Sequence, residues 1–254
     1  QVKKALDAAE GSYDKGLQLN KIHYKCMVGM FDLFSGQKRY ADAYEIAKKI
    51  SQYFPANPQR LTQVLKLAIF TQSYEDVERY YQVFTKIDVR NDDVIRYVCA
   101  ALVVCGKYYL QQKVPSRALE LFNKAAVTSA GRGKTLQEII TALVENRMAK
   151  EAETYLARFP SDQQNMGAYH GLRLLIQDEL APVGAGGVIV GAGRDLISKG
   201  MKDPLLYEVM IRRSLKESLR DAAESLVTEG GKLWPEKKVH FDAVFQENLK
   251  HSKK

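Results

Sequence analysis

The sequence predicts an all-α fold built as a stack of antiparallel helix pairs. The main observation is a pattern centred on a small apolar residue, found at Ala43, Val77, Ala118 and Ala152. The first and last intervals are 34 residues and the middle one is 41. A period in this range is typical of a solenoid, in which each helix pair is too small to bury its own apolar face and stacks on the next. The seven prolines mostly separate the periodic segments, as expected of residues between helices.

Apolar residues spaced i, i+3, i+4 and i+7 form one stripe on a helix and define the expected elements. We expect helices over residues 2–15, 17–35, 38–53, 58–72, 74–87, 91–112, 115–129, 133–147, 149–158, 162–180, 192–199, 204–216, 218–231 and 237–249. Asn57-Pro58 and Asp203-Pro204 are typical helix starts, because the side chain caps free N–H groups and proline fits the first turn. Asn91 is a third candidate cap.

The 41-residue interval contains seven residues more than the others. The third repeat is regular from Leu102 onward, so the extra residues lie before it, around Asp88–Ala101. Seven residues make about two helical turns, which would lengthen one helix without rotating its buried face much. The extension is either a contact for a partner or a tolerated insertion.

The residues at the repeated positions resemble the tetratricopeptide repeat (TPR) family. Its pattern has a large apolar residue, Leu-Gly and Tyr on the first helix, then Ala and an aromatic residue on the second. The best-matched repeat has these at Leu102, Cys105, Gly106, Tyr109, Ala118 and Phe122. Three other repeats have first-helix stripes at Met27, Met30, Phe31 and Phe34, at Leu61, Val64, Leu65 and Ala68, and at Leu136, Ile139, Ile140 and Leu143. The alternative is an irregular helical bundle with accidental periodicity.

The resemblance implies a right-handed TPR-like superhelix of about six antiparallel helix pairs. Residues 1–160 would hold a flanking helix and four TPR-like repeats, residues 161–236 two degenerate repeats, and residues 237–254 a capping helix with a basic tail. Ala192 and Ala223 are the expected small residues of the degenerate repeats, because each lies twelve residues before a proline, as Ala43 does.

The glycine-rich segment Pro182–Gly193 interrupts the fifth repeat. Its run Val188–Val190, followed by Gly191-Ala192-Gly193, imitates the start of a dinucleotide-binding motif, but Leu196 stands where a third glycine is required and no βαβ pattern surrounds it. We therefore expect no nucleotide here. Because glycines carry a high ordering entropy, we predict an exposed, mobile loop between two helices, open to proteolysis.

Bulk composition excludes several classes of function. The net charge of +8 is spread along the chain rather than concentrated in a stripe, which argues against nucleic-acid binding. The three cysteines, Cys26, Cys99 and Cys105, lie in apolar helical runs without metal-ligand spacing, which predicts reduced, buried thiols and a cytoplasmic protein. No arrangement typical of a nucleophilic or acid–base catalyst is found, so the chain is predicted not to be an enzyme and to need no cofactor.

In TPR proteins the first helix of each pair faces a concave groove, and this resemblance supplies the candidate binding residues. They are Lys25, Gln59, Gln63, Lys66, Lys107, Lys134 and Gln137. Lys66 and Lys107 stand where the family's clamp for C-terminal carboxylates has asparagine, so the chain departs from that clamp. The lysines predict attraction of an acidic or phosphorylated segment; the alternative interpretation is a merely solvated face.

The predicted function is that of a scaffold or adaptor for protein partners, as part of a larger regulatory or signalling protein. Because the sequence starts in what looks like a polar helix, it also resembles the TPR part of bacterial response regulators, and we expect further sequence upstream. The segment Lys237–Lys254 is a capping helix or a self-association helix. The alternative function is a basic α-solenoid that binds nucleic acid.

Overall fold

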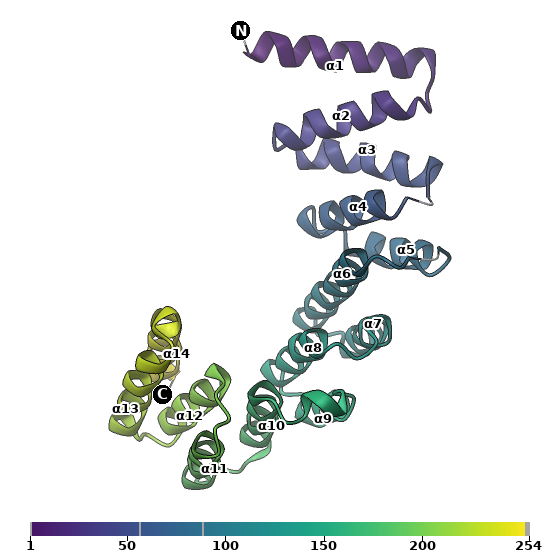
Figure 1. Ribbon diagram of the computed structural model, residues 1–254. Helices are drawn as coiled ribbons and strands as arrows, with labels where there is room; N and C mark the ends of the chain where they lie inside the picture. Colours follow the sequence, from purple (N-terminus) through teal and green to yellow (C-terminus); the bar gives the residue numbers. More distant parts are fainter. Residues whose placement is uncertain (1, 56, 88, 252–254) are drawn as a thin grey trace. The chain divides into compact units, whose positions relative to one another are not determined.

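The computed structural model describes residues 2–55, 57–87 and 89–251, and it is helical throughout this part of the chain (Figure 1). By its internal contacts the chain divides into two compact units, residues 1–130 and 131–254. The first unit contains α1 (Val2–Leu19), α2 (Tyr24–Gly36), α3 (Tyr40–Tyr53), α4 (Pro58–Phe70), α5 (Tyr74–Phe84), α6 (Asp92–Gln111) and α7 (Pro115–Thr128). The second contains α8 (Gly133–Glu145), α9 (Ala149–Leu156), α10 (Gly167–Leu180), α11 (Gly186–Ser198), α12 (Pro204–Lys216), α13 (Arg220–Leu233) and α14 (Lys238–His251), with 3-10 turns at Ser161–Gln163 and Pro235–Lys237.

The helices form six consecutive pairs, from α2–α3 to α12–α13, flanked by α1 and α14. In the first unit α4 packs against α6, the first helix of the next pair, and also against α3, the second helix of the preceding pair. In the second unit α8, α10, α12 and α14 contact one another in the same sequence. The predicted all-α fold of about six antiparallel pairs is confirmed. The predicted domain boundaries at residues 160 and 236 stay a prediction.

The turns inside most of the pairs share one backbone geometry. Five of the six turns place a non-glycine residue in the left-handed region, five residues before the small second-helix residue; these are Lys38, Gln72, Lys113, Arg147 and Ser218, with φ of 58 to 61°. The next residue donates its N–H to a carbonyl five residues back, as Val114 does to Tyr109 at 2.9 Å. This Schellman arrangement satisfies carbonyls that the helix end leaves free. The repeated turn places the small second-helix residue at the same distance after the end of the first helix in these five pairs.

The small residues of the pattern lie at the fourth position of their helices and are completely buried. Ala43, Val77, Ala118, Ala152 and Ala223 each have a relative exposure of 0%. The first-helix stripes predicted from the sequence are also in the core, from Met27 on α2 to Leu143 on α8, except for the partly buried Tyr109. The predicted caps are confirmed as well: Asn57, Asn91 and Asp203 each accept backbone N–H groups of the helix that follows.

Replacing Ala118 with leucine should destabilise the first unit by about 1–3 kcal/mol, because added methylenes at a close helix contact force neighbours apart. Ala100 lies on the exposed side of α6 and provides the control. Thermal melts should show a clear loss for Ala118→Leu and almost none for Ala100→Leu. Equal melting temperatures for the two variants would contradict the packing register.

The seven-residue insertion lengthens α6, as predicted. This helix has 20 residues, whereas α4 and α8, the first helices of the neighbouring pairs, have 13. The extra turns are packed on one side, since Val94 and Val98 are buried, while Tyr97 is half exposed. Asp88, part of the predicted insertion, lies outside the described residues.

The prediction of a mobile loop at Pro182–Gly193 is wrong. Helix α11 begins at Gly186, so the connection after α10 is short, and the helix buries Gly186, Ile189 and Gly193 along one side. The glycines permit close packing: a Cβ at Gly193 would lie 2.6 Å from Sδ of Met210 on α12. Contact with the neighbouring helices offsets the ordering entropy on which the prediction relied.

The small position of the fifth repeat is also corrected. Ala192 is only half-buried, and Ile189 holds the fourth position of α11, where the other second helices have Ala or Val. The left-handed residue five positions earlier is Gly184, with φ of 91°. The repeat therefore continues through the glycine-rich segment, with the small residue displaced by one turn to Gly193.

The first two helices differ from their predicted ranges, 2–15 and 17–35. In the structure α1 continues to Leu19 and α2 begins only at Tyr24. Gly16 lets α1 approach α2, because a Cβ there would lie 2.5 Å from Sγ of Cys26.

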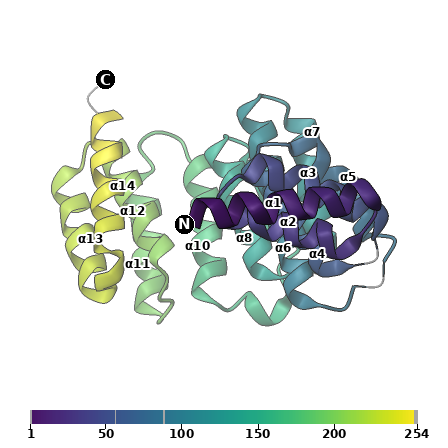
Figure 2. The ribbon, with the colours of Figure 1, turned by 90° about the horizontal axis from the view of Figure 1, so that it is seen from above.

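Helix α14 covers the last pair. It lies beside α12 and α13 in both views (Figures 1 and 2), and Phe241, Val244 and Phe245 are buried in a core shared with Tyr207 and Leu226. This agrees with the predicted capping helix, whose apolar residues, except the exposed Val239, are used inside the unit. Self-association through Lys237–Lys254 stays a prediction, and residues 252–254 lie outside the described part of the chain.

Candidate functional site

Two of the predicted groove lysines lie at equivalent positions on adjacent helices of the first unit. Lys66 on α4 and Lys107 on α6 each precede the small residue of their repeat by eleven positions. Lys66 is exposed and Lys107 is half-buried. Neither side chain forms a hydrogen bond or ion pair with the described residues. Two lysine side chains without an internal ion-pair partner therefore lie on helices that pack against each other.

Three further groove residues lie on α2 and α4. Lys25 and Gln59 are both exposed and occupy one register, eighteen residues before Ala43 and Val77. Gln63 is less available, because its side-chain oxygen accepts a hydrogen bond from Nη1 of Arg60 at 2.6 Å.

Lys134 and Gln137 lie on α8 in the second unit. Both line a hollow of about 360 Å³ formed with the start of α10, to which Phe159, Gln163 and Tyr169 also contribute. Lys134 is exposed and Gln137 half-buried. That all seven residues serve one groove stays a prediction.

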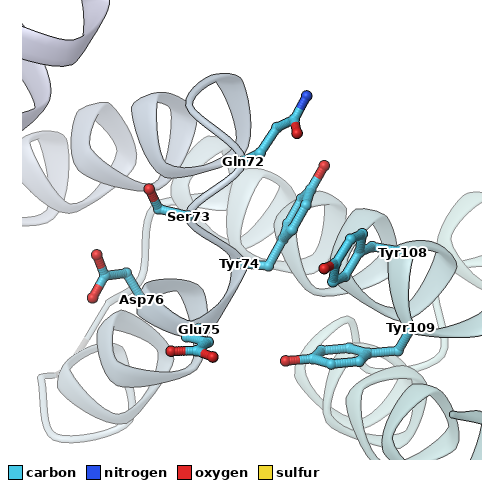
Figure 3. Close-up of a pocket in the computed structure, with 7 residues that line it drawn as sticks. All are labelled: Gln72, Ser73, Tyr74, Glu75, Asp76, Tyr108 and Tyr109. Atoms are coloured by element: carbon cyan, nitrogen blue, oxygen red, sulfur yellow. The ribbon is translucent and has the colours of Figure 1, made fainter. Parts of the chain in front are cut away.

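The sequence did not predict a hollow of about 440 Å³ in the first unit, which we call the tyrosine hollow. It lies between the α4–α5 turn and the last turns of α6 (Figure 3) and is lined by Gln72, Ser73, Tyr74, Glu75, Asp76, Tyr108 and Tyr109. The rings of Tyr74 and Tyr108 are stacked, with centroids 4.2 Å apart. Figure 3 shows Tyr109 extending from α6 toward Glu75 on α5.

The carboxylates around this hollow are differently engaged. Asp76 accepts a hydrogen bond from the Tyr44 hydroxyl at 2.5 Å and pairs with Arg79 at 3.0 Å. Glu78, two residues further along α5, pairs with Arg117 and Lys124. Glu75 is exposed and pairs with no cation in the part of the chain that the structure describes. Burial, followed by the nearby Glu78 carboxylate, raises the pKa of Tyr109, so its phenol stays neutral at physiological pH.

A third hollow, of about 480 Å³, lies between α3 and α5 and contains Lys48, Lys49 and Arg79. Two of these three cations are paired with nearby carboxylates. Lys48 pairs with Glu45 at 2.5 Å, and Arg79 pairs with Asp76.

Other chemistry has few candidates among the described residues. Cys99 and Cys105 are buried, as predicted, whereas Cys26 is half-buried. Burial raises the pKa of the Cys105 thiol to about 12, so it is not a reactive thiolate. Within the described residues no group of three or more His, Cys, Asp or Glu side chains could hold a metal ion. Among the described residues, none of the helices combines the length and the hydrophobicity that a transmembrane segment requires.

No protein-family model matches the sequence, and no curated protein matches it. Among solved structures, the chain is similar to a tetratricopeptide repeat protein from Parabacteroides merdae, at 12% identity and a TM-score of 0.46, covering 99% of this chain and 94% of that one. It is also similar to PilF from Pseudomonas aeruginosa, at 16% identity and a TM-score of 0.43, with 96% and 89% covered.

The helix pairs themselves carry the assignment of the fold. They combine the 34-residue spacing, the buried small residue on the second helix and the apolar stripe on the first, as at Leu102 and Cys105. The fold is TPR-like. The further resemblance to a bacterial response regulator, the signalling role and the cytoplasmic location stay predictions.

Proposed function

We propose that this TPR-like protein is a binding scaffold for another protein, and that an acidic or phosphorylated segment of the partner lies along the first helices of its pairs. Stacked helix pairs present an extended surface suited to a peptide. The observation that carries the proposal is the pair Lys66 and Lys107, two cations without internal partners at one repeat position on contacting helices.

Geometry favours a segment that follows the repeats rather than a single anion. Lys25 and Gln59 repeat one register, and Lys66 and Lys107 repeat another, two turns further along their helices. An extended peptide with acidic residues at intervals could meet several of these side chains at once. The charge would mainly speed association and select the partner, as interface charges commonly do.

Charge reversal at Lys66 and Lys107 to glutamate should weaken binding of acidic peptides more than about tenfold, because two attractive contacts become repulsive. Fluorescence anisotropy with acidic and phosphorylated peptide libraries measures this. The matched control reverses Lys49 and Lys150, which are exposed on second helices and change the net charge equally. Equal loss in both double variants would reduce the effect to bulk charge and refute the groove.

The same variants distinguish the alternative function. A nucleic-acid-binding solenoid would bind unrelated DNA or RNA with an affinity that falls steeply with salt. If an oligonucleotide of random sequence binds in this way and acidic peptides do not, the protein-scaffold proposal is wrong.

A further inference from the structure

We propose that the tyrosine hollow is a second binding site, which takes an arginine side chain of a partner protein. The inference rests on the proposed function only in that its occupant is a protein segment. Its chemistry is opposite to that of the lysine positions, since the hollow offers aromatic rings and a carboxylate to a cation.

The hollow gathers three aromatic rings around an open space. Tyr74 and Tyr108 stack on each other, and Tyr109 lies edge-on to Tyr108 with the ring centroids 5.3 Å apart. All three residues are only partly buried. Aromatic faces attract cations through the ring quadrupole, and arginine is the cation found most often in such contacts.

The carboxylates beside the rings determine that a bound ligand would be positively charged. Of the carboxylates beside the rings, Asp76 is engaged by Tyr44 and Arg79, but Glu75 has no cation within the described chain. An unpaired carboxylate at the edge of an aromatic hollow is complementary to a cation and repels an anion. Lys107 is next to Tyr108 in sequence but does not line the hollow.

The shape of the donor group favours arginine over lysine. A guanidinium is planar, so it can lie on a tyrosine ring while its N–H groups point along the ring plane toward a carboxylate. Figure 3 shows Tyr109 and Glu75 approaching each other across the hollow, which would allow one guanidinium to meet both. Arginine bound in this way would anchor a partner segment at the turn edge of the second and third pairs.

The probes are three peptides, acetyl-Gly-Arg-Gly-amide and its counterparts with lysine and with citrulline, which has the shape of arginine without the charge. Titration followed by ¹H–¹⁵N NMR should shift amides of residues 72–76 and 107–110. We expect the arginine peptide to bind about fivefold more tightly than the citrulline peptide, with lysine between them.

Glu75→Gln should weaken binding of the arginine peptide about three- to fivefold, the range of an exposed ion pair, and leave the melting curve unchanged. The control is Glu145→Gln, which removes an exposed carboxylate from α8 and should have no effect. Equal binding of arginine and citrulline peptides, or an unchanged affinity in Glu75→Gln, overturns the proposal. The acidic-peptide experiment uses ligands of opposite charge and different variants, so either proposal can fail alone.

Discussion

Replacing Arg213 with alanine should destabilise the second unit by about 3–5 kcal/mol, because it removes one of the two cations that pair with the buried Asp178 carboxylate. Arg213 and Asp178 have relative exposures of 3% and 5% and lie 3.5 Å apart. The same guanidinium pairs with Glu217 at 2.9 Å and donates a hydrogen bond to the carbonyl of Pro182. After the substitution Asp178 keeps only Lys216, which is half exposed.

The contacts of Arg213 and Glu217 also position the connection between α10 and α11. Glu217, held by Arg213, accepts a hydrogen bond from the N–H of Gly184 at 2.9 Å. Arg213 itself binds the carbonyl of Pro182, two residues earlier. Loss of the guanidinium therefore removes the hydrogen bond to Pro182 and the ion pair with Glu217, both of which hold the segment before α11. It also removes a partner of the buried Asp178 carboxylate.

The chain provides its own probe for this experiment. Trp234 is the only tryptophan, and it lies at the end of α13 with its ring 5.6 Å from that of Tyr207. Its fluorescence during urea unfolding reports on the second unit. Arg212→Ala is the matched control, because Arg212 has one distant ion pair, to Glu208 at 3.9 Å, and should cost at most about 1 kcal/mol.

A second variant separates charge from packing. Replacing both partners, as Asp178→Leu with Arg213→Met, should cost less than Arg213→Ala alone, since apolar substitutes for a buried ion pair are often neutral. If Arg213→Ala and Arg212→Ala shift the urea midpoint equally, the buried ion pair contributes nothing to stability.

The sequence predicted the parts of the fold that depend on short-range chemistry. Asn57 and Asp203 were recognised as caps because a cap acts on backbone N–H groups two or three residues away. The small residues Ala43 and Ala118 were recognised because their period repeats the same helix contact. Such features need no knowledge of which distant side chains meet.

The glycine-rich segment shows where this reasoning fails. Helix propensity assigns α11 to a loop, since Gly186 and Gly193 are poor helix formers. Their neighbours decide otherwise: Gly193 accommodates Met210, seventeen residues later, and Gly186 accommodates Glu217. Close approach between helices is a tertiary property, and propensity does not report it.

The two candidate sites also differ in how far the sequence could predict them. The register of Lys66 and Lys107 follows from the period, so the sequence could place them at equivalent positions. The tyrosine hollow could not be found, because Tyr74, at the start of a second helix, meets Tyr108, near the end of the next first helix. Glu75 and Asp76 are neighbours in the first turn of α5, and only their different partners distinguish them.

Replacing Phe122 with alanine should destabilise the first unit by about 3–5 kcal/mol, through lost burial and the cavity left behind. Phe122 on α7 has a relative exposure of 0%, and its ring lies over Gly106 on α6. A Cβ at Gly106 would lie 2.2 Å from Cε1 of this ring. The Leu-Gly position of the TPR pattern, here Cys105-Gly106, thus makes room for the aromatic residue of the second helix.

The pairing of Gly106 with Phe122 can be tested by a double-mutant cycle. Gly106→Ala should cost about 1–3 kcal/mol by overpacking, although alanine is the better helix former by about 1 kcal/mol. Gly11→Ala on α1, where no atom lies within 4 Å of an added Cβ, should show the propensity gain alone.

Combined with Phe122→Leu, Gly106→Ala should cost much less, because the ring that it meets is gone. Urea unfolding, with hydrogen exchange of the α6 and α7 amides as the readout, measures the free energy of unfolding of each variant in the cycle. Strict additivity would mean that the glycine and the ring do not interact, and that the TPR-like packing of this pair has another origin.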